Sequence, residues 1–219
     1  MKRIGVLGGT FDPIHLGHLT HAEQVREQLA LDEMRLMPAH IPPHRASPQV
    51  DAVERAQLVR LALTDYPQLT LDERELGRQK PSYTVDSLAA LRAESGPTVG
   101  LYFVMGMDSL CAINQWHQWQ QLIELANLVI LARPEVAPPA PGSEVGRFVQ
   151  DFGCTRAALL ARPHGGIWMM DALHLPVSAT DIRAALAAGR SARQWLTPAV
   201  ADYVEAHKLY VALADERHS

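Results

Sequence analysis

The stretch RIGVLGGTFDPIHLGHLTHAEQVREQLALDEMRLM, residues 3–37, decides the fold. Its first segment, Arg3–Leu7, predicts a short buried strand, and Gly8–Leu16 predicts a loop rich in Gly, Pro and Asp. Gly17–Leu29 carries apolar residues at helical spacing, and Met34–Met37 is a second short apolar run. Because parallel strands need a crossover of this length, the order strand, loop, helix, strand predicts a parallel βαβ unit.

Strands and helices also alternate along the rest of the chain. Helices are predicted over Asp51–Leu63, Thr84–Arg92, Gln118–Leu125, Ser178–Ala188 and from Thr197 to about His207. Strands are predicted over Leu69–Leu76, Val99–Val104, Leu128–Ala132, Ile167–Met170 and Leu173–Leu175, and loops over Pro38–Pro48 and Pro134–Ser143. This alternation is typical of an α/β fold, so we expect a Rossmann-like, doubly wound, mostly parallel sheet flanked by helices.

The composition of the 219 residues is that of an ordinary globular protein. Apolar residues make up 47% and charged residues 20%, which argues against a disordered chain or a coiled coil. The apolar runs are far shorter than the roughly 20 residues of a membrane span, so we expect no membrane partner. Because 20 basic residues stand against 24 acidic ones, giving a formal charge of -4, we expect no nucleic-acid partner either.

The cysteines and the N-terminus point to a reducing compartment. Cys111 and Cys154 form no CxxC pair, so neither a disulfide framework nor a cysteine-based zinc site is expected. Met1–Leu7 imitates the start of a signal peptide, but Gly8–Gly9 and Asp12–Pro13 break the apolar run too early. We therefore expect a first strand there and a cytoplasmic protein.

The predicted loop after the first strand has the features of a phosphate site. Ligands of open α/β sheets bind outside the carboxyl ends of strands, and Gly8 and Gly9 permit a close approach to the backbone. The helix that begins near Gly17 offers free amides and the positive end of its dipole. His15 and His18 flank that helix start, so both side chains can point at one anion. The dinucleotide fingerprint G-x-G-x-x-G is missing, and no lysine precedes Ser or Thr as in a Walker loop.

The residues alone leave other interpretations of this loop open. Gly8–Gly9 is compatible with a plain turn, and the histidines with surface residues. His15, His18 and His21 also repeat every third residue, as metal ligands on one helix can. No carboxylate or cysteine stands at the spacing of a zinc protease site, so no metal ligands are expected from this chain.

The segment Gly9–His18, GTFDPIHLGH, resembles the G-x-F-x-P-x-H-x-G-H signature of the HIGH-motif nucleotidyltransferase superfamily. Six fixed positions out of ten make this signature specific. The resemblance implies that His15 and His18 are catalytic and hold phosphates of ATP. It also implies ATP contacts for Gly8, Gly9, Thr10, Phe11 and Gly17.

Val177–Arg183 predicts a second anion site at the start of a helix. Ser178 can cap this helix, its amides favour an anion, and Arg183 offers a planar fork of donors. By itself the segment favours a capped helix with a solvated arginine. It resembles the superfamily's I-S-S-T-x-I-R motif, which holds the terminal phosphates of ATP, with Ala179 in place of the second serine. The resemblance implies ATP contacts for Ser178 and Thr180 and a catalytic role for Arg183.

The two motifs lie near opposite ends of the chain. One fold that joins them over a single triphosphate accounts for this spacing. We therefore expect a single nucleotidyltransferase domain over residues 1–219, with a small helical part at about 178–210. A homo-oligomer is compatible with the sequence.

The middle of the chain selects one family within the superfamily. Pro42–Arg45, PPHR, resembles the P-P-H-K/R loop of bacterial nicotinate mononucleotide adenylyltransferases. Further signatures of that family are matched by Ser82–Thr84, Gly106–Asp108, Trp116 with Trp119, Leu131–Pro134, Tyr203 and Leu209–Tyr210. The resemblance thus covers nearly the whole chain. Ala39–His40 departs from it, because many members carry asparagine just before the loop.

The resemblance implies that His44, Arg45, Tyr83, Thr84 and Trp116 bind the mononucleotide. Their chemistry agrees, because an indole stacks on a flat ring, His44 beside Arg45 suits a phosphate, and the amides near Tyr83 suit a carboxylate. Trp116 is equally compatible with a core position, and the His44–Arg45 segment with an ordinary surface loop.

On the ATP side, the resemblance implies contacts from Gly106, Asp108 and Arg133. Asp108 follows a predicted strand end, where acidic residues of α/β nucleotide sites accept from ribose hydroxyls. It is also compatible with a helix cap. Arg133 would lie along the adenosine, or else simply end a strand.

The resemblance therefore implies adenylyl transfer from ATP to nicotinate mononucleotide, which yields nicotinate adenine dinucleotide and pyrophosphate. We expect Mg²⁺ as cofactor, held with the triphosphate by phosphate oxygens and water. Phosphopantetheine adenylyl transfer is an alternative, although that family is usually shorter and lacks the Pro-Pro-His loop. A non-catalytic nucleotide-binding module is another, and a redox enzyme is disfavoured by the missing glycine fingerprint.

Overall fold

The computed structural model describes residues 1–40, 48–78, 83–132, 135–173 and 175–211. At its centre lies a six-stranded sheet in the order β3-β2-β1-β4-β5-β6, with every neighbouring pair parallel. The strands are β1 (Arg3–Gly9), β2 (Glu33–Pro38), β3 (Leu69–Leu71), β4 (Gly100–Gly106), β5 (Asn127–Ala132) and β6 (Ile167–Asp171). The Rossmann-like α/β fold predicted from the sequence is confirmed, and this sheet is wholly rather than mostly parallel.

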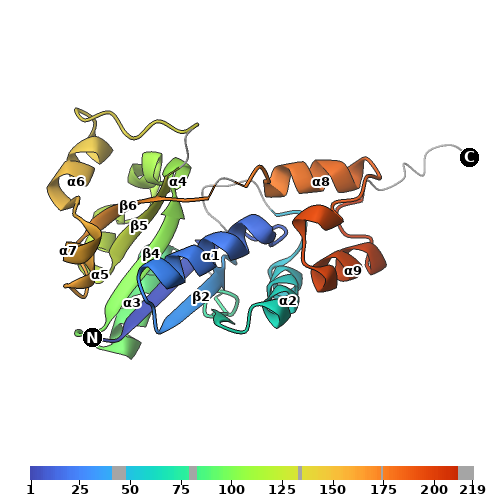
Figure 1. Ribbon diagram of the computed structural model, residues 1–219, viewed down its shortest axis with the longest axis horizontal. Coiled ribbons are helices and arrows are strands. Elements are labelled where there is room, and N and C mark those ends of the chain that lie inside the picture. Colours follow the sequence, from blue (N-terminus) through green and yellow to red (C-terminus); the bar gives the residue numbers. More distant parts are fainter. Residues whose placement is uncertain (41–47, 79–82, 133–134, 174, 212–219) are drawn as a thin grey trace, which may run out of the picture.

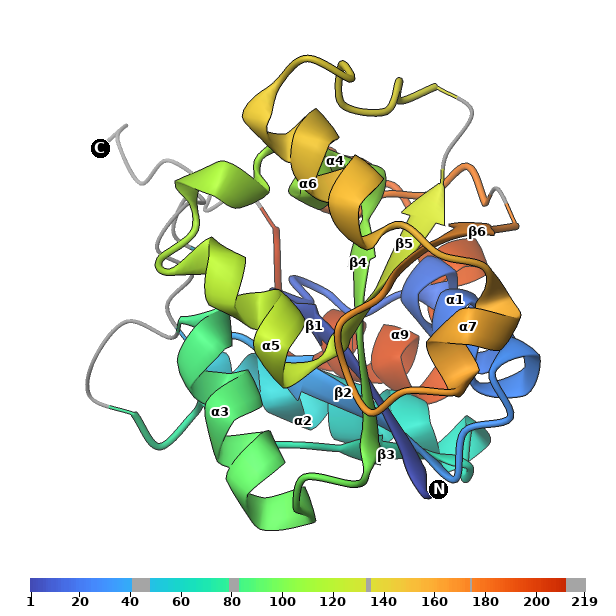
Figure 2. The same cartoon turned by 90° about the vertical axis from the view of Figure 1, so that its left-hand side faces the viewer.

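Helices cover both faces of the sheet (Figures 1 and 2). The core on one face includes α1 (Leu16–Gln28), α2 (Ala52–Ala62), α7 (Arg156–Leu160), α8 (Ala179–Ala187) and α9 (Pro198–Ala206). The core on the other face includes α3 (Thr84–Ser95), α4 (Met107–Cys111), α5 (Leu122–Leu125) and α6 (Glu144–Phe152). Short 3₁₀ turns lie at Leu63–Asp65, Ile113–Gln115, Trp119–Gln121 and Arg193–Trp195. In the described part of the chain, no helix is both long and apolar enough to cross a membrane.

β4 shows why both faces are covered. Leu101, Phe103 and Met105 belong to the core of the α3–α6 face, whereas Tyr102 and Val104 belong to the core of the opposite face. Successive side chains of a strand point to opposite faces, so an uninterrupted apolar run is typical of a parallel strand buried on both sides.

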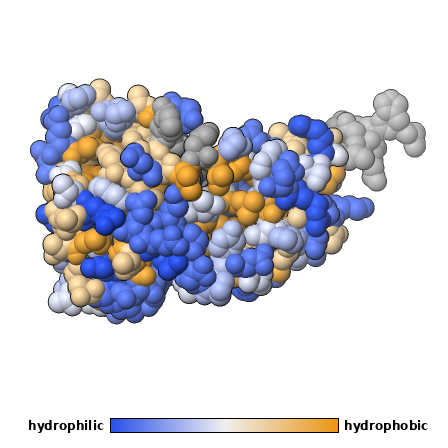
Figure 3. All heavy atoms as spheres, viewed as in Figure 1, coloured by the Kyte–Doolittle hydropathy of each residue, from blue (hydrophilic) through white to orange (hydrophobic). Residues whose placement is uncertain are grey.

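The C-terminal helices α8 and α9 lie together at one end of the molecule, where α9 packs on α2 (Figure 1). On the face shown in Figure 3, hydrophobic side chains group where the chain crosses from the sheet to α8, with hydrophilic ones on either side. This end of the molecule adjoins the carboxyl ends of β1 and β2.

β1 is longer than the sequence predicted. Gly8 and Gly9, expected in the loop, are its last residues and pair with Met37 and Pro38 of β2. The prediction was wrong here because the pairing depends on a neighbouring strand, which the local glycine content does not reveal. The loop that connects β1 to α1 is correspondingly short.

Most other elements lie within a few residues of their predicted positions, including α2, α3, α8, α9, β4, β5 and β6. The predicted strand Leu69–Leu76 is reduced to Leu69–Leu71, because Asp72 accepts hydrogen bonds from the backbone and side chain of Arg74, at 3.2 and 2.8 Å, and the chain turns there. The predicted helix Gln118–Leu125 consists of a 3₁₀ turn followed by α5.

The segment Leu173–Leu175 was wrongly predicted as a strand, since neither Leu173 nor Leu175 belongs to one. The backbone of Leu173 binds α1 instead. Its N–H donates to Gln24 Oε1 at 3.1 Å, and its carbonyl oxygen lies 3.0 Å from His21 Nε2. These contacts attach the connection between β6 and α8 to the helix that follows the first strand.

Helices α4, α6 and α7 lie where the sequence predicted none. Of these, α6 and α7 each begin at a side-chain cap. Ser143 Oγ accepts from the Gly146 N–H at 3.0 Å, and Thr155 Oγ1 accepts from the Ala158 N–H at 3.3 Å. A Ser or Thr before an apolar pattern is a sequence signal for a helix start, and it was available for both.

Candidate active site

The predicted phosphate site lies at the carboxyl ends of β1 and β4. Strands β1, β2 and β3 follow one another toward one edge of the sheet, and β4, β5 and β6 follow one another toward the other edge. The direction of the strand order therefore reverses between β1 and β4. Ligands of open α/β sheets bind in the crevice at such a reversal. The N-terminus of α1, at Leu16, also lies at this edge and adds the positive end of its helix dipole.

His15 and His18 form a stacked pair at the start of α1. Their ring centroids are 3.7 Å apart with planes inclined by 29°, and the backbone N–H of His15 donates to Nδ1 of His18 at 3.3 Å. A neutral His18 ring whose Nδ1 accepts carries its proton on Nε2. Phe11 packs edge-on against His18, with 5.0 Å between ring centroids. The loop thus fixes both imidazoles at the helix N-terminus, as the motif predicts.

The glycines of the motif make room for its own side chains. A Cβ at Gly9 would lie 2.8 Å from the ring of Phe11, a buried residue with a left-handed φ of 49°. A Cβ at Gly17 would lie 3.0 Å from the ring of His15 and 3.1 Å from Val177. A side chain at either position would therefore displace the groups that the loop has to hold.

The structure brings the second motif to the same loop. Arg183, on α8, donates from Nη1 to the backbone carbonyl of Asp12 at 2.7 Å and from Nη2 to Thr180 Oγ1 at 3.3 Å. Ser178 caps α8, because its Oγ accepts from the Asp181 N–H at 3.1 Å. Residues separated by 171 positions are thus joined at the end of β1.

Contacts from three distant segments meet at Asp12, a residue to which the sequence analysis gave no role. Its side chain is buried, Oδ1 accepts from the Tyr210 hydroxyl at 2.9 Å, and Oδ2 accepts from the Gln49 N–H at 3.0 Å. Burial and the charge of Asp12 raise the pKa of Tyr210 well above its ordinary value. The loop is therefore attached to α8 through Arg183, to the residues just before α2 through Gln49, and to the C-terminal segment through Tyr210.

The described residues predicted to bind the mononucleotide meet beside β4. Thr84 is the first residue of α3, and Tyr83 is its N-cap. The ring of Tyr83 lies against His117, with centroids 4.5 Å apart, next to Trp116. Trp116 is half-buried and packs edge-to-face on Phe103 at 6.4 Å. Trp116 therefore combines a packing contact with a partly accessible surface.

On the predicted adenosine side, Gly106 ends β4 and is the N-cap of α4, whose first turn carries the exposed Asp108. Both lie at the same sheet edge as the loop between β1 and α1, and Asp108 does not cap the helix, because Gly106 is its N-cap. Three predicted residues, His44, Arg45 and Arg133, lie outside the residues that the structure describes.

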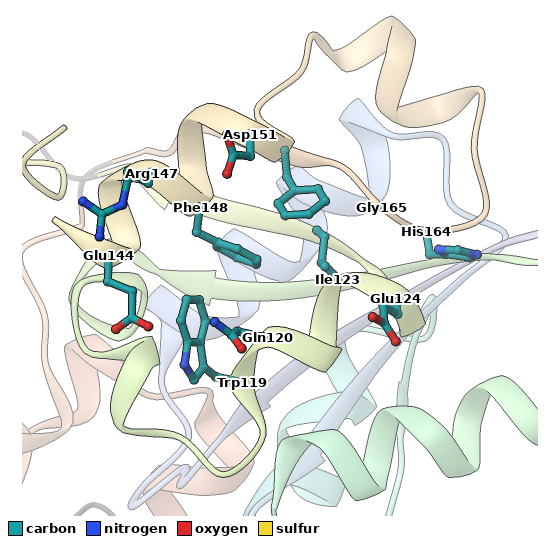
Figure 4. Close-up of a pocket in the computed structure, with 11 residues that line it drawn as sticks. Trp119, Gln120, Ile123, Glu124, Glu144, Arg147, Phe148, Asp151, His164 and Gly165 are labelled. Atoms are coloured by element: carbon teal, nitrogen blue, oxygen red, sulfur yellow. The ribbon is translucent and has the colours of Figure 1, made fainter. Parts of the chain in front are cut away.

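A separate pocket lies between α5 and α6, on the face of the sheet that α3, α4, α5 and α6 cover (Figure 4). Trp119, Ile123 and Phe148 form its apolar wall, and Glu144 and Arg147 lie at its rim. Among the described residues, none that was predicted to bind ATP or the mononucleotide lines this pocket. The candidate site is thus defined by the loops at the ends of β1 and β4.

Solved structures share this architecture. A Plasmodium falciparum nicotinic acid mononucleotide adenylyltransferase complexed with NaAD matches with a TM-score of 0.73 over 96% of this chain and 98% of its own. A structure of the same enzyme complexed with APC matches with a TM-score of 0.71 over the same shares. At 17% identity, these similarities establish the fold.

Sequence comparison gives a closer grouping. The model of the cytidylyltransferase-like family matches residues 6–185. The probable nicotinate-nucleotide adenylyltransferase of Aeromonas salmonicida is 47% identical over 95% of this chain and 97% of the relative. That of Pseudomonas aeruginosa is 44% identical over 96% and 98%. The chain therefore belongs to the cytidylyltransferase-like family, among the nicotinate-nucleotide adenylyltransferases.

Proposed function

We propose that this chain transfers the adenylyl group of ATP to nicotinate mononucleotide, giving nicotinate adenine dinucleotide and pyrophosphate, as a step of NAD biosynthesis. The observation that carries the proposal is the 2.7 Å hydrogen bond from Arg183 to the carbonyl of Asp12, which joins the two segments predicted to bind phosphates beside the N-terminus of α1. A triphosphate can reach both motifs. Relatives named for this reaction, which match nearly the whole chain, support the choice of acceptor.

The proposed reaction requires positioning and charge stabilisation. An oxygen of the mononucleotide 5′-phosphate attacks the α-phosphorus of ATP, and the bond from this phosphorus to the oxygen of the leaving pyrophosphate breaks. The attacking phosphate is already ionised near neutral pH, so neither a general base nor a covalent enzyme intermediate is needed. Pyrophosphate leaves with the electron pair, so donors placed around it lower the barrier.

The residues at the end of β1 are suited to that task. His15 and His18 would hold the α- and β-phosphates while negative charge moves toward the leaving group. Arg183 would hold the departing pyrophosphate from the start of α8. The further proposed ATP contacts on these two segments are Gly8, Gly9, Thr10, Phe11, Gly17, Ser178 and Thr180.

The acceptor would bind at the neighbouring strand ends. Trp116 would stack on the pyridine ring, and the amides at Tyr83 and Thr84 would receive the nicotinate carboxylate. His44 and Arg45 would contact the mononucleotide phosphate. Beside them, the adenosine of ATP would contact Gly106, Asp108 and Arg133.

We also propose that Mg²⁺ enters with the triphosphate and neutralises part of its charge. Asp12, the carboxylate of the loop, is already engaged by Tyr210 and Gln49. Among the described residues, no group of three or more His, Cys, Asp or Glu side chains is placed to hold a metal ion. Phosphate oxygens and water would therefore supply most of the ligands.

The proposed compartment is the cytoplasm. Cys111 and Cys154 are both free thiols, which agrees with a reducing environment. ATP and a mononucleotide are the proposed small-molecule partners.

The proposed function is tested by measuring pyrophosphate release from Mg-ATP with three acceptors supplied separately. Release with nicotinate mononucleotide alone is the expected result. Comparable release with nicotinamide mononucleotide would keep the reaction and remove the acid specificity. Release only with phosphopantetheine would overturn the acceptor assignment, and ATP binding without release to any acceptor would favour a nucleotide-binding module.

A further inference from the structure

Arg55, on α2, is a fully buried arginine at the edge of the candidate site. Its side chain has no exposed surface, and none of the described carboxylates forms an ion pair with it. Burial lowers the pKa of its guanidinium, and the charge of nearby Asp12 opposes that effect. Burying a charge in this way is unfavourable unless its donors are satisfied, so the contacts that satisfy it indicate what the residue does.

All of the hydrogen bonds that the Arg55 guanidinium makes with described residues are to backbone carbonyls. Nη1 donates to Thr10, and Nη2 donates to Ala39 at 2.8 Å and to His40 at 2.9 Å. Nε donates to Val50 at 3.1 Å. One planar group therefore holds four points of main chain in a fixed relation.

These four points belong to two different parts of the site. Thr10 opens the loop between β1 and α1, which we call the ATP loop; His15 ends this loop, and His18 lies in the first turn of α1. Ala39 and His40 follow β2, and Val50 precedes α2, so they flank segment 41–49, which we call the mononucleotide segment. It includes His44 and Arg45, two of the five residues proposed to bind the mononucleotide. A further hydrogen bond, from the Ala39 N–H to the Gly9 carbonyl at 2.8 Å, joins the same two parts directly.

We propose that Arg55 is a positioning residue that fixes the ATP loop relative to the mononucleotide segment, so that the attacking phosphate meets the α-phosphorus in line. This inference rests on the proposed function. Displacing reacting groups by about 1 Å can lower a rate by roughly 100-fold, which is the sensitivity that such a connection would control. An arginine that only stabilises the fold would not control the rate in this way, so the effect on kcat distinguishes the two roles.

Arg92 provides the matched control. It also donates only to backbone carbonyls among its described hydrogen bonds, namely those of Gly96, Val99, Leu125 and Pro163, at 2.6 to 3.1 Å. Burial lowers the pKa of this guanidinium as well. Its partners precede β4, β5 and β6, at the opposite edge of the sheet from the candidate site. Arg92 thus joins main-chain segments in the same manner, away from the substrates.

The test compares Arg55→Lys with Arg92→Lys, each against wild type, by thermal unfolding and by steady-state kinetics. Both variants should lower the unfolding temperature. Only Arg55→Lys should lower kcat per folded molecule, by about 100-fold, with smaller changes in the affinity for each substrate alone. Unchanged kcat in Arg55→Lys, or an equal loss in Arg92→Lys, would overturn the inference. Should a lysine variant not fold, the pair Arg55→Met and Arg92→Met, which buries no charge, takes its place.

Hydrogen exchange separates this inference from the proposed function, because it needs no acceptor. A non-hydrolysable ATP analogue should slow exchange at Phe11 and Asp12 and also at Ala39, His40 and Val50 in wild type. Arg55→Lys should confine the protection to the first two residues, whereas Arg92→Lys should leave the wild-type pattern. Identical patterns in all three proteins would overturn the role of Arg55. If the three proteins show the expected exchange patterns but wild type releases no pyrophosphate, the proposed function is overturned and the role of Arg55 in the loop structure is retained.

Discussion

The hydroxyl of Tyr210 donates to Oδ1 of Asp12 at 2.9 Å, so a residue near the C-terminus holds the loop that follows the first strand. Both side chains are buried, and 198 positions separate them in the sequence. The other carboxylate oxygen of Asp12 accepts from the Gln49 N–H, and its carbonyl accepts from Arg183. The geometry of the loop between β1 and α1 therefore depends on segments from the whole length of the chain.

Replacing Tyr210→Phe removes one donor from a buried carboxylate, so the free energy of unfolding should fall by about 1–3 kcal/mol. Chemical denaturation measures this change. Tyr203→Phe is the control, because the Tyr203 hydroxyl binds Glu54 at 3.0 Å in a more exposed place and its loss should change stability by about 0.5 kcal/mol or less. Equal losses in the two variants would contradict a special role for the Asp12 contact.

The same contact should make stability sensitive to alkaline pH. Burial, then the charge and hydrogen bond of Asp12, raise the pKa of Tyr210 in the folded protein. Above about pH 10 the unfolded chain releases this phenolic proton while the folded chain keeps it, so the free energy of unfolding falls as pH rises. Tyr210→Phe should show a shallower fall than wild type when denaturation is measured from pH 8 to 11. Parallel curves would contradict the prediction.

His18 should matter more for turnover than for acceptor binding, because its contact with the phosphates strengthens as charge develops. His18→Ala should lower kcat by about 100- to 1,000-fold and change the mononucleotide Kd little. His18→Asn keeps an acceptor for the His15 N–H but loses Nε2, so it should lose a similar amount. Unchanged turnover in His18→Ala would contradict its assigned role, and recovery in His18→Asn would assign the loss to the loop structure.

The two neighbouring tryptophans should separate binding from packing. Trp116→Ala should raise the KM for the mononucleotide with little effect on the KM for ATP, because the half-buried ring is proposed to stack on the pyridine. Trp119 is buried against Phe148, with ring centroids 4.8 Å apart, so Trp119→Ala should instead lower stability by about 3–5 kcal/mol. Equal effects of Trp116→Ala on both KM values would identify it as a packing residue.

The contiguous parts of the site could be predicted from the sequence. His15 and His18 lie in one short motif, and their position depends only on the strand and helix on either side of it. Ser178 is likewise recognised as a local cap. Local spacing carries this information, because a helix N-terminus and its capping groups form within a few residues.

The connections between distant segments could not be predicted in this way. Arg55 resembles any arginine on a polar helix face, yet it is fully buried and binds four carbonyls. Asp12 and Tyr210 each belong to a sequence motif, but their contact arises only when the C-terminal segment folds back onto the loop. Gly8 and Gly9 similarly became strand residues through pairing with β2.

The most direct test of the central claim is to follow labelled phosphorus from ATP. With nicotinate mononucleotide and Mg²⁺, label in the α-phosphate should appear in the dinucleotide, and label in the γ-phosphate should appear in pyrophosphate. Mass spectrometry or chromatography of the products gives the answer. Transfer of the γ-label to the acceptor, or no transfer of either label, would contradict adenylyl transfer at the site where Arg183 meets Asp12.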